Sequence, residues 1–183
     1  MSSAAVNDIH SELNETVVDD VVAVDSLESI QDTVRRAAAE GKPVAISGGR
    51  HAMGGQQFCA GGLLIDTRGL DRILGLDGEH GIIEVEAGVQ WPALIDRLAT
   101  EPWGIGQKQT GADRLSIGGA IAANVHGRGL AMKPIVSDVE SLVLVTADGE
   151  AVTCSRDENA ELFGLVAGGY GLFGCVYSAK LRL

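Results

Sequence analysis

The stretch Ala45-Ile46-Ser47-Gly48-Gly49-Arg50-His51-Ala52-Met53-Gly54-Gly55-Gln56 decides how this chain folds. It leaves a short apolar run, residues 43–46, and carries one histidine between two glycine pairs. Glycine pairs permit positive φ angles and a close approach of the backbone to a ligand. Successive backbone N–H groups in such a turn can form a nest for an anion such as a phosphate. A plain glycine-rich turn explains the same residues equally well, because short glycine patterns often match by accident.

The residues before this loop have the pattern of a strand–helix–strand unit. Residues 21–24 and 43–46 are apolar runs typical of strands. Between them, Asp25 and Glu28 have the spacing of a capping box, and Gly41 stands where a helix would stop. This pattern predicts a βαβ unit with a right-handed crossover. Residues 1–20 are polar and acidic, and we expect a loose lead-in there.

Beyond the glycine loop, short strands alternate with short helices. Strands are predicted at residues 63–66, 72–76, 82–86, 139–146, 151–154 and 175–183, and helices at residues 91–98 and from a capping box at Ser155 and Glu158. In the helix 91–98 we expect Leu94, Ile95 and Leu98 to face inward, with Trp91 as a core aromatic. Glu84 and Glu86 share one strand face, which suits acid–base chemistry but is better explained by a solvated sheet face.

A second informative stretch covers residues 109–129. Ser116 is a plausible N-cap, and Gly118-Gly119 opens a turn of small residues that ends at Ala123. Free N–H groups and the positive dipole end at such a helix start would suit a phosphate. A tightly packed internal helix with a glycine exit is the alternative.

A literal G-x-G-x-x-G occurs at Gly169, Gly171 and Gly174. A dinucleotide fingerprint must follow a strand and open a helix, whereas this one follows a predicted helix and opens a strand. The Rossmann interpretation therefore fails, and a turn that passes a ligand or a packed helix describes the segment better.

Composition excludes several classes of function. The 183 residues carry a formal net charge of −11, which argues against a surface for nucleic acid or an anionic membrane. The start lacks the basic region of a signal peptide, and no apolar run approaches the length of a membrane span. Cys59, Cys154 and Cys175 show no metal-like spacing, so we expect free thiols, no metal and a cytoplasmic location.

Four motifs in this order resemble a known family. They are the loop 47–56, Thr110-Gly111 with Ser116-Ile117-Gly118-Gly119, Asn124-Val125-His126-Gly127, and the ending from Glu161-Leu162-Phe163 to Gly174-Cys175-Val176. Together they resemble the FAD-binding domain of the vanillyl-alcohol oxidase and p-cresol methylhydroxylase (PCMH-type) family of FAD-linked oxidases, over residues 21–183. The resemblance implies an α+β fold of two α/β lobes: a small βαβ lobe, about 21–80, and a larger mixed-sheet lobe, about 81–183.

The resemblance also implies which residues contact FAD. The first loop would wrap the pyrophosphate, the later segments would line the cofactor's path, and Ala123 to His126 would lie near the flavin. The cofactor-binding residues implied are Ile46, Ser47, Gly48, Gly49, Arg50, His51, Ala52, Met53, Gly54, Gly55, Gln56, Thr110, Gly111, Ser116, Ile117, Gly118, Gly119, Ala123, Asn124, His126 and Val176.

Two histidines receive roles from the resemblance. His51 occupies the position of a histidine that many members bond covalently to the flavin 8α-methyl, although a noncovalent histidine against the ring is the alternative. His126 would lie beside the isoalloxazine as a catalytic residue, or else be a histidine satisfied by neighbouring carbonyls. His10 and His80 are given no role.

The implied function is that of an FAD-linked oxidase or dehydrogenase which moves hydride from a small molecule, such as an alcohol or sugar, to flavin N5. The alternative is a flavin-binding module that is inactive alone. In this family a substrate-binding domain follows the FAD domain and covers the flavin. We therefore expect either a partner chain, as in a heteromer subunit, or a missing C-terminal substrate domain.

Overall fold

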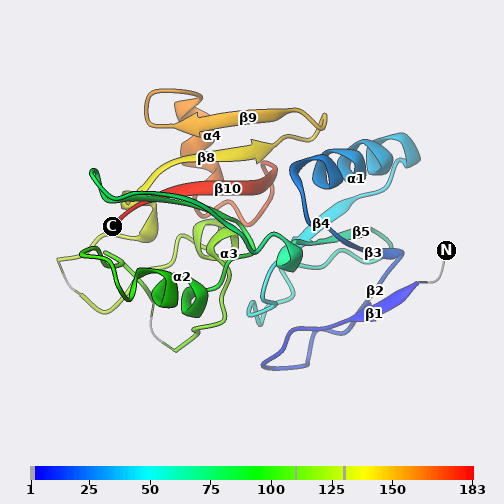
Figure 1. The fold of residues 1–183 in the computed structure, drawn as a ribbon. Coiled ribbons are helices and arrows are strands. Elements are labelled where there is room, and N and C mark those ends of the chain that lie inside the picture. The colour runs from blue at the N-terminus through cyan, green and yellow to red at the C-terminus, as the bar shows by residue number, and fades with distance from the viewer. Residues whose placement is uncertain (1–2, 110, 130) are drawn as a thin grey trace.

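The computed structural model describes residues 3–109, 111–129 and 131–183. It combines a small parallel sheet and a larger antiparallel sheet with four α-helices, and the first described strand, β1 (Ala4–Val6), and the C-terminus lie at opposite sides of the molecule (Figure 1). This arrangement has the mixed α and β character predicted from the sequence. The short 3₁₀ helices η1 (Thr67–Gly69) and η2 (Ile135–Ser137) lie in the connections.

The small sheet contains the predicted strand–helix–strand unit. Its strands are β3 (Asp20–Ala23), β4 (Val44–Ser47) and β5 (Leu63–Asp66), all parallel in the order β3-β5-β4. Helix α1 (Leu27–Glu40) connects β3 to β4, so β5 is inserted between the two strands of the unit. All four residues of β5 are buried, as expected for a central strand covered on both faces.

The N-terminal cap of α1 differs from the prediction. Ser26, not Asp25, is the N-cap: its hydroxyl accepts from the Ser29 amide, and the Ser29 hydroxyl accepts from the Ser26 amide. The reciprocal pair is thus Ser26 and Ser29 instead of Asp25 and Glu28, because the helix begins one residue later than the carboxylate spacing suggested. The predicted stop is confirmed, since Gly41 closes the helix with a φ of +64°.

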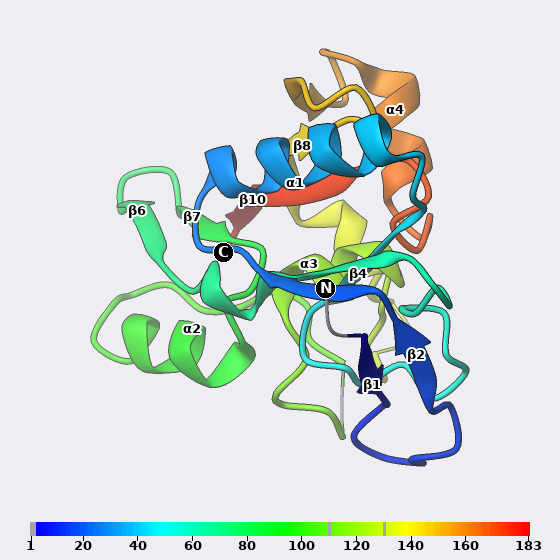
Figure 2. The same ribbon diagram turned by 90° about the vertical axis from the view of Figure 1, so that its right-hand side faces the viewer.

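Residues 3–20 are not a loose lead-in. Strands β1 (Ala4–Val6) and β2 (Thr16–Val18) form an antiparallel pair, whose buried Val6 and Val18 pack on Leu64 of β5. On the other face of the same sheet, Ile65 packs against α1. Figure 2 shows α1 on one side of the small sheet and the β1–β2 pair on the other. Successive side chains of β5 point to opposite faces of the sheet, so their burial requires α1 on one face and the β1–β2 pair on the other. The polar composition of residues 1–20 gave no sign of the second layer.

The large sheet is antiparallel, in the order β6-β7-β10-β8-β9. Its strands are β6 (Ile73–Asp77), β7 (Ile82–Glu86), β8 (Val139–Val145), β9 (Ala151–Ser155) and β10 (Cys175–Arg182). Both predicted hairpins are confirmed, and the last strand of the chain lies at the centre. The change from one sheet to the other falls between Asp66 and Ile73, whereas the two-lobe division near residue 80 stays a prediction.

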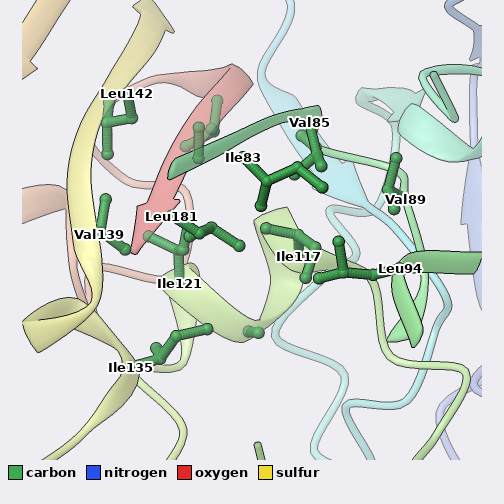
Figure 3. Close-up of a cluster of buried hydrophobic side chains, with 14 of the residues drawn as sticks. Ile83, Val85, Val89, Leu94, Ile117, Ile121, Ile135, Val139, Leu142 and Leu181 are labelled. Atoms are coloured by element: carbon green, nitrogen blue, oxygen red, sulfur yellow. The ribbon is translucent and has the colours of Figure 1, made fainter. Parts of the chain in front are cut away.

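The main core lies between this sheet and the helices α2 (Trp91–Leu98), α3 (Ile117–Ala122) and α4 (Ala160–Val166). Figure 3 shows Ile83 of β7, Ile117 of α3 and Leu181 of β10 meeting in this core. Trp91 is buried as predicted, but Ile95 is 47% exposed, because only one narrow stripe of the short α2 helix faces the sheet.

The predicted capping box at Ser155 and Glu158 does not form. The Ser155 hydroxyl accepts from the amides of Asp157 and Glu158, which makes a local turn, and α4 starts only at Ala160. Its N-cap residue, Asn159, has a φ of +48° and makes no capping hydrogen bond with its side chain. A serine that closes its own turn competes with helix formation.

Glu86 also corrects the sequence analysis. It is fully buried instead of solvated, and its carboxylate accepts from the backbone amide of Arg72 at 2.9 Å and from the Arg72 guanidinium at 2.7 Å. Burial alone would raise the pKa of Glu86, but these hydrogen bonds outweigh it and hold the pKa below its ordinary value. Glu86 is therefore a structural ion that joins the start of β6 to β7.

Candidate functional site

A cavity of about 350 Å³ opens where the two sheets meet. It lies between the end of β4 with the glycine loop that follows, the start of α3, and the segment from Val166 to Val176. Twelve of the site residues predicted from the sequence line this cavity: Ile46, Gly48, Gly49, Arg50, His51, Ala52, Gln56, Ser116, Gly118, Gly119, Ala123 and Val176. The fold thus gathers residues from three distant motifs around one space.

Other predicted site residues do not line this cavity. These are Ser47, Met53, Gly54, Gly55, Gly111, Ile117, Asn124 and His126, whereas Thr110 lies outside the described residues. Ser47 and Ile117 are buried beside the lining as the last residue of β4 and the first of α3. Met53 is 60% exposed, on the part of the glycine loop that leaves the cavity.

The first half of the glycine loop passes very close to its neighbours. A side chain at Gly48 would collide with the Ser116 hydroxyl, and one at Gly49 would lie 2.5 Å from the Arg114 carbonyl oxygen. Within the described residues, the amides from Gly48 to Ala52 donate to no other protein group. The loop therefore combines a backbone that only glycine can supply with amides that remain available to an anion.

An ion pair fixes the conformation of this loop. Arg50 has a φ of +57°, which is unusual for a residue with a side chain, and its guanidinium lies 3.2 Å from the Asp66 carboxylate. Asp66 also pairs with Arg68. Burial would raise the pKa of Asp66, but the Arg68 hydrogen bonds and the two positive charges keep it below its ordinary value. Arg50 and Arg68 thus share the single Asp66 carboxylate, and the buried Nε of Arg50 has no partner among the described residues.

His51 contacts a residue that the sequence analysis left without a role. His10 Nε2 lies 2.6 Å from His51 Nδ1, and the two ring centroids are 4.7 Å apart. Burial lowers the pKa of His51 and the proximity of His10 lowers it further, and these two effects outweigh the hydrogen-bonding effect of the nearby Arg114 backbone, which raises it. In the described structure His51 Nε2 is buried without a hydrogen-bond partner. No sequence pattern links two histidines 41 residues apart, so only the fold reveals this pair.

The start of α3 does not offer free amides to a phosphate, contrary to the prediction. The amides of Ile117 and Gly118 donate to the carbonyls of Val89 and Ala87, and the Gly119 amide donates to the Ser116 hydroxyl. Ser116 is the N-cap as predicted. The alternative of a tightly packed helix is correct for its N-terminus, because residues 87–90 run beside it and use its donors. Gly118 and Gly119 give the cavity a flat wall instead.

Several lining residues were not assigned from the sequence. Four come from the glycine-rich segment before β10: Tyr170, Gly171, Phe173 and Gly174. The amide of Tyr170 donates to the carbonyl of Ala122, which ties this segment to α3. The prediction of a turn that passes a ligand or packed helix did identify the segment. Of the others, Val125 lies in the predicted motif 124–127, and Gln109, Ala112, Leu115 and Ala122 lie in the informative stretch 109–129, whereas Gln57, Thr67, Ala87 and Val166 received no site role from the sequence.

The cavity is mainly apolar, with a few unsatisfied polar atoms. Besides His51 Nε2, the side-chain oxygen of Gln109 is buried without a partner among the described residues. Such a lining suits a flat, largely apolar ligand with a few hydrogen-bonding positions. His126 is exposed, and its Nδ1 lies 3.0 Å from the Gly127 carbonyl oxygen, so its catalytic role stays a prediction.

Other classes of site find little support in the described part of the chain. It contains no cluster of three or more histidine, cysteine or acidic residues that could hold a metal ion. Its helices include none with both the length and the apolar character needed to cross a bilayer. The three cysteines are free thiols, and burial raises the pKa of Cys175 to about 12.

Comparison with known proteins gives a consistent result. The family model described as "FAD binding domain" matches residues 18–155. An uncharacterized oxidoreductase of the fasciation locus of Rhodococcoides fascians is 31% identical over 89% of this chain and 37% of its own length. An L-gulono-1,4-lactone dehydrogenase of Mycobacterium tuberculosis is 33% identical over 76% of this chain and 32% of its own length. Cytokinin dehydrogenase 3 of Oryza sativa is 31% identical over 76% of this chain and 27% of its own length. The chain spans about a third of the length of these relatives.

Proposed function

The chain belongs to the FAD binding domain family, and from this premise we propose that its cavity holds FAD for an FAD-linked oxidase or dehydrogenase. The single observation that carries the proposal is the meeting of the glycine loop, α3 and the Tyr170–Gly174 segment around one apolar cavity.

The residues present fit this cofactor. FAD combines two phosphates with two flat ring systems, so it needs anion-binding amides beside an apolar slot. The uncommitted amides from Gly48 to Ala52 supply the first, and the flat wall of Gly118 and Gly119 supplies part of the second. The Arg50 guanidinium, which shares the Asp66 carboxylate with Arg68 and has an unpartnered Nε, lies in the lining beside these amides.

The chain's own part in the reaction is binding and orientation. FAD, when bound, supplies the capacity to accept a hydride from a small-molecule substrate such as an alcohol or a sugar. We assign Gly48–Ala52 to the pyrophosphate, and Ala123 and Val176 to the ring systems. His51 is proposed as a covalent attachment point, supported by its place in the cavity wall and by burial, which lowers its pKa and favours the neutral imidazole. His126 remains a proposed catalytic residue, supported by its position next to Val125 in the lining.

Uptake of FAD tests the proposal directly. Purified chain is mixed with FAD, separated from free cofactor by gel filtration, and examined for flavin absorbance. Ala123 and Ala99 both follow the last turn of a short helix, but only Ala123 lines the cavity. We expect A123W to lose FAD uptake by steric filling and A99W to retain it. A wild-type chain that stays colourless would contradict the proposal.

Covalent attachment is tested by intact mass after denaturation. Wild-type chain should carry the added mass of FAD, whereas H51A should not, although H51A still binds the cofactor reversibly. If FAD is held in the cavity, His51 would supply the nitrogen that replaces a hydrogen of the 8α-methyl group; two protons would pass to solvent, and the two electrons would pass by way of the flavin to dioxygen. A wild-type mass without the cofactor would leave FAD noncovalent and refute the tether.

We propose further that a substrate-binding part, either a further domain or a partner chain, covers the cavity rim. Three apolar side chains support this proposal, because Tyr170, Leu172 and Phe173 are 53%, 84% and 39% exposed, and two of them line the cavity. Anaerobic addition of L-gulono-1,4-lactone to the FAD-loaded chain distinguishes an oxidoreductase that acts alone from a flavin-binding module that needs a partner. Bleaching would show turnover by this chain alone, whereas a stable yellow colour would favour a module that needs its partner.

A further inference from the structure

The N-terminal segment Asn7–Asn14 contacts the glycine loop at three points, all on the part that carries His51. The Ile9 amide donates to the Arg50 carbonyl at 3.1 Å, His10 Nε2 meets His51 Nδ1 at 2.6 Å, and the Asn14 side-chain amide donates to the Met53 carbonyl at 2.6 Å. This segment precedes the residues matched by the family model, which begin at residue 18. Its contacts with the loop are therefore a feature of this chain that the family match does not cover.

A buried carboxylate gives the segment its shape. Asp8 is only 2% exposed, and its oxygens accept from the amide and hydroxyl of Ser11, from the His10 amide and from the Asn14 side chain. The largest effect on the pKa of Asp8 is the Asn14 hydrogen bond, and the pKa lies far below its ordinary range. His10 and Asn14 are thus both held by Asp8 while they reach the glycine loop.

We propose that His10 is a positioning residue for His51, which engages Nδ1 of that imidazole and so leaves Nε2 as the nitrogen available to a cofactor in the cavity. This inference rests on the proposed function, because it assigns His51 to the cofactor. In a neutral imidazole one nitrogen donates and the other accepts, and the hydrogen bond made by one nitrogen sets the role of the other. A contact of 2.6 Å between Nε2 and Nδ1 requires one donor and one acceptor: either His51 Nδ1–H donates and leaves Nε2 unprotonated, or Nδ1 accepts and Nε2 carries the proton. Because only an unprotonated Nε2 can bond to a cofactor, the proposal gives the donor role to His51 Nδ1 and the acceptor role to His10 Nε2.

The surroundings of the pair favour control by His10. His10 is exposed, so water satisfies its second nitrogen in either tautomer, whereas His51 Nε2 is buried, close to the Arg114 backbone. The tautomer of His51 therefore depends on these protein contacts and not on solvent. Without His10, the His51 ring loses the hydrogen bond that fixes its orientation at the cavity wall.

The test compares H10A, H10Q and H80A with the wild-type chain. The glutamine amide can occupy the place of His10 Nε2 and restore a hydrogen bond to Nδ1. His80 is a matched control, because it is an exposed histidine that bonds to Asp77 in a hairpin turn and does not line the cavity. Each variant is first checked for an unchanged circular dichroism spectrum and melting temperature.

Two measurements decide the outcome. Side-chain ¹⁵N shifts of His51 in the FAD-free chain, assigned by their loss in H51Q, should show one tautomer in wild type, H10Q and H80A, and a mixture in H10A. The affinity for FAD, measured for reversible binding before a covalent bond forms, should fall about tenfold in H10A, the usual scale for one lost hydrogen bond, and be restored in H10Q. If the wild-type chain binds no FAD, the proposed function fails. The ¹⁵N shifts would still show whether His10 controls the tautomer of His51.

Other results would overturn the inference. An unchanged His51 tautomer in H10A would show that His10 does not control the ring. A changed tautomer with an unchanged affinity for FAD would reduce the contact to a structural one, and so would an equal loss of affinity in H10A and H10Q.

Discussion

At the scale of single residues, the glycine loop depends on the absence of side chains at two positions. Gly48 and Gly49 bring the backbone against Ser116 and the Arg114 carbonyl, so the loop and α3 touch without intervening side chains. Arg50 then takes a left-handed conformation that its pairing with Asp66 stabilises. The amides between them are left for an anion. The positions of the glycines were visible in the sequence, whereas the reason for each was not.

Replacing Gly48 by alanine tests this packing. The new methyl group would collide with the Ser116 hydroxyl, so we expect G48A to lower the free energy of unfolding by about 1–3 kcal/mol, as overpacked sites do, and to weaken FAD uptake. Urea denaturation and flavin absorbance measure the two effects. G104A is the control, since a side chain at Gly104 meets no atom within 4 Å. Equal stability of the two variants would show that the loop can move away from α3.

At the scale of elements, polar contacts hold each sheet at the two ends of the connection between them. The connection from β5 to β6 turns through η1, where Thr67 donates its hydroxyl to the Ser47 carbonyl at 3.1 Å. Five residues further on, Arg72 pairs with Glu86 where β6 begins.

The Arg72–Glu86 pair predicts a dependence of stability on pH. Because the pKa of Glu86 is lower in the folded chain than in the unfolded chain, the pair stabilises the fold above the ordinary glutamate pKa of about 4.3, and this contribution is lost as the pH falls through the folded value. We expect E86Q to cost about 1–2 kcal/mol at pH 7, reduced by the solvent around the exposed Arg72. Urea denaturation at several pH values should show the gap closing below about pH 4. A gap that is constant with pH would contradict the ionic role of Glu86.

At the scale of the whole molecule, the cavity is a seam between two sheets of different kinds. Helix α1 and the β1–β2 pair enclose the small parallel sheet, and the large antiparallel sheet carries α2, α3 and α4. A ligand in the seam contacts loops that follow both sheets. Its binding therefore couples the stability of one part to that of the other.

This coupling predicts that FAD raises the melting temperature of the whole chain in a single transition. At a free concentration about 100 times Kd, the cofactor should add about 2.7 kcal/mol to the free energy of unfolding. Differential scanning calorimetry measures the shift, and A123W, with its cavity filled, should show none. Two separate transitions, of which FAD moves only one, would show that the sheets unfold independently.

The sequence by itself determined the local features of this protein: most strands and helices, both hairpins, the Gly41 stop, the Ser116 cap and the glycine-rich segments that meet at the cavity. These follow from residue spacing, because capping, turns and apolar periodicity depend on neighbours in the chain. Only the tertiary structure decided that Glu86 is buried, that the first amides of α3 are already used by residues 87–90, and that His10 reaches His51. Each of these depends on which distant segments pack together, and the energies of burial and hydrogen bonding that decide it are set by the completed fold.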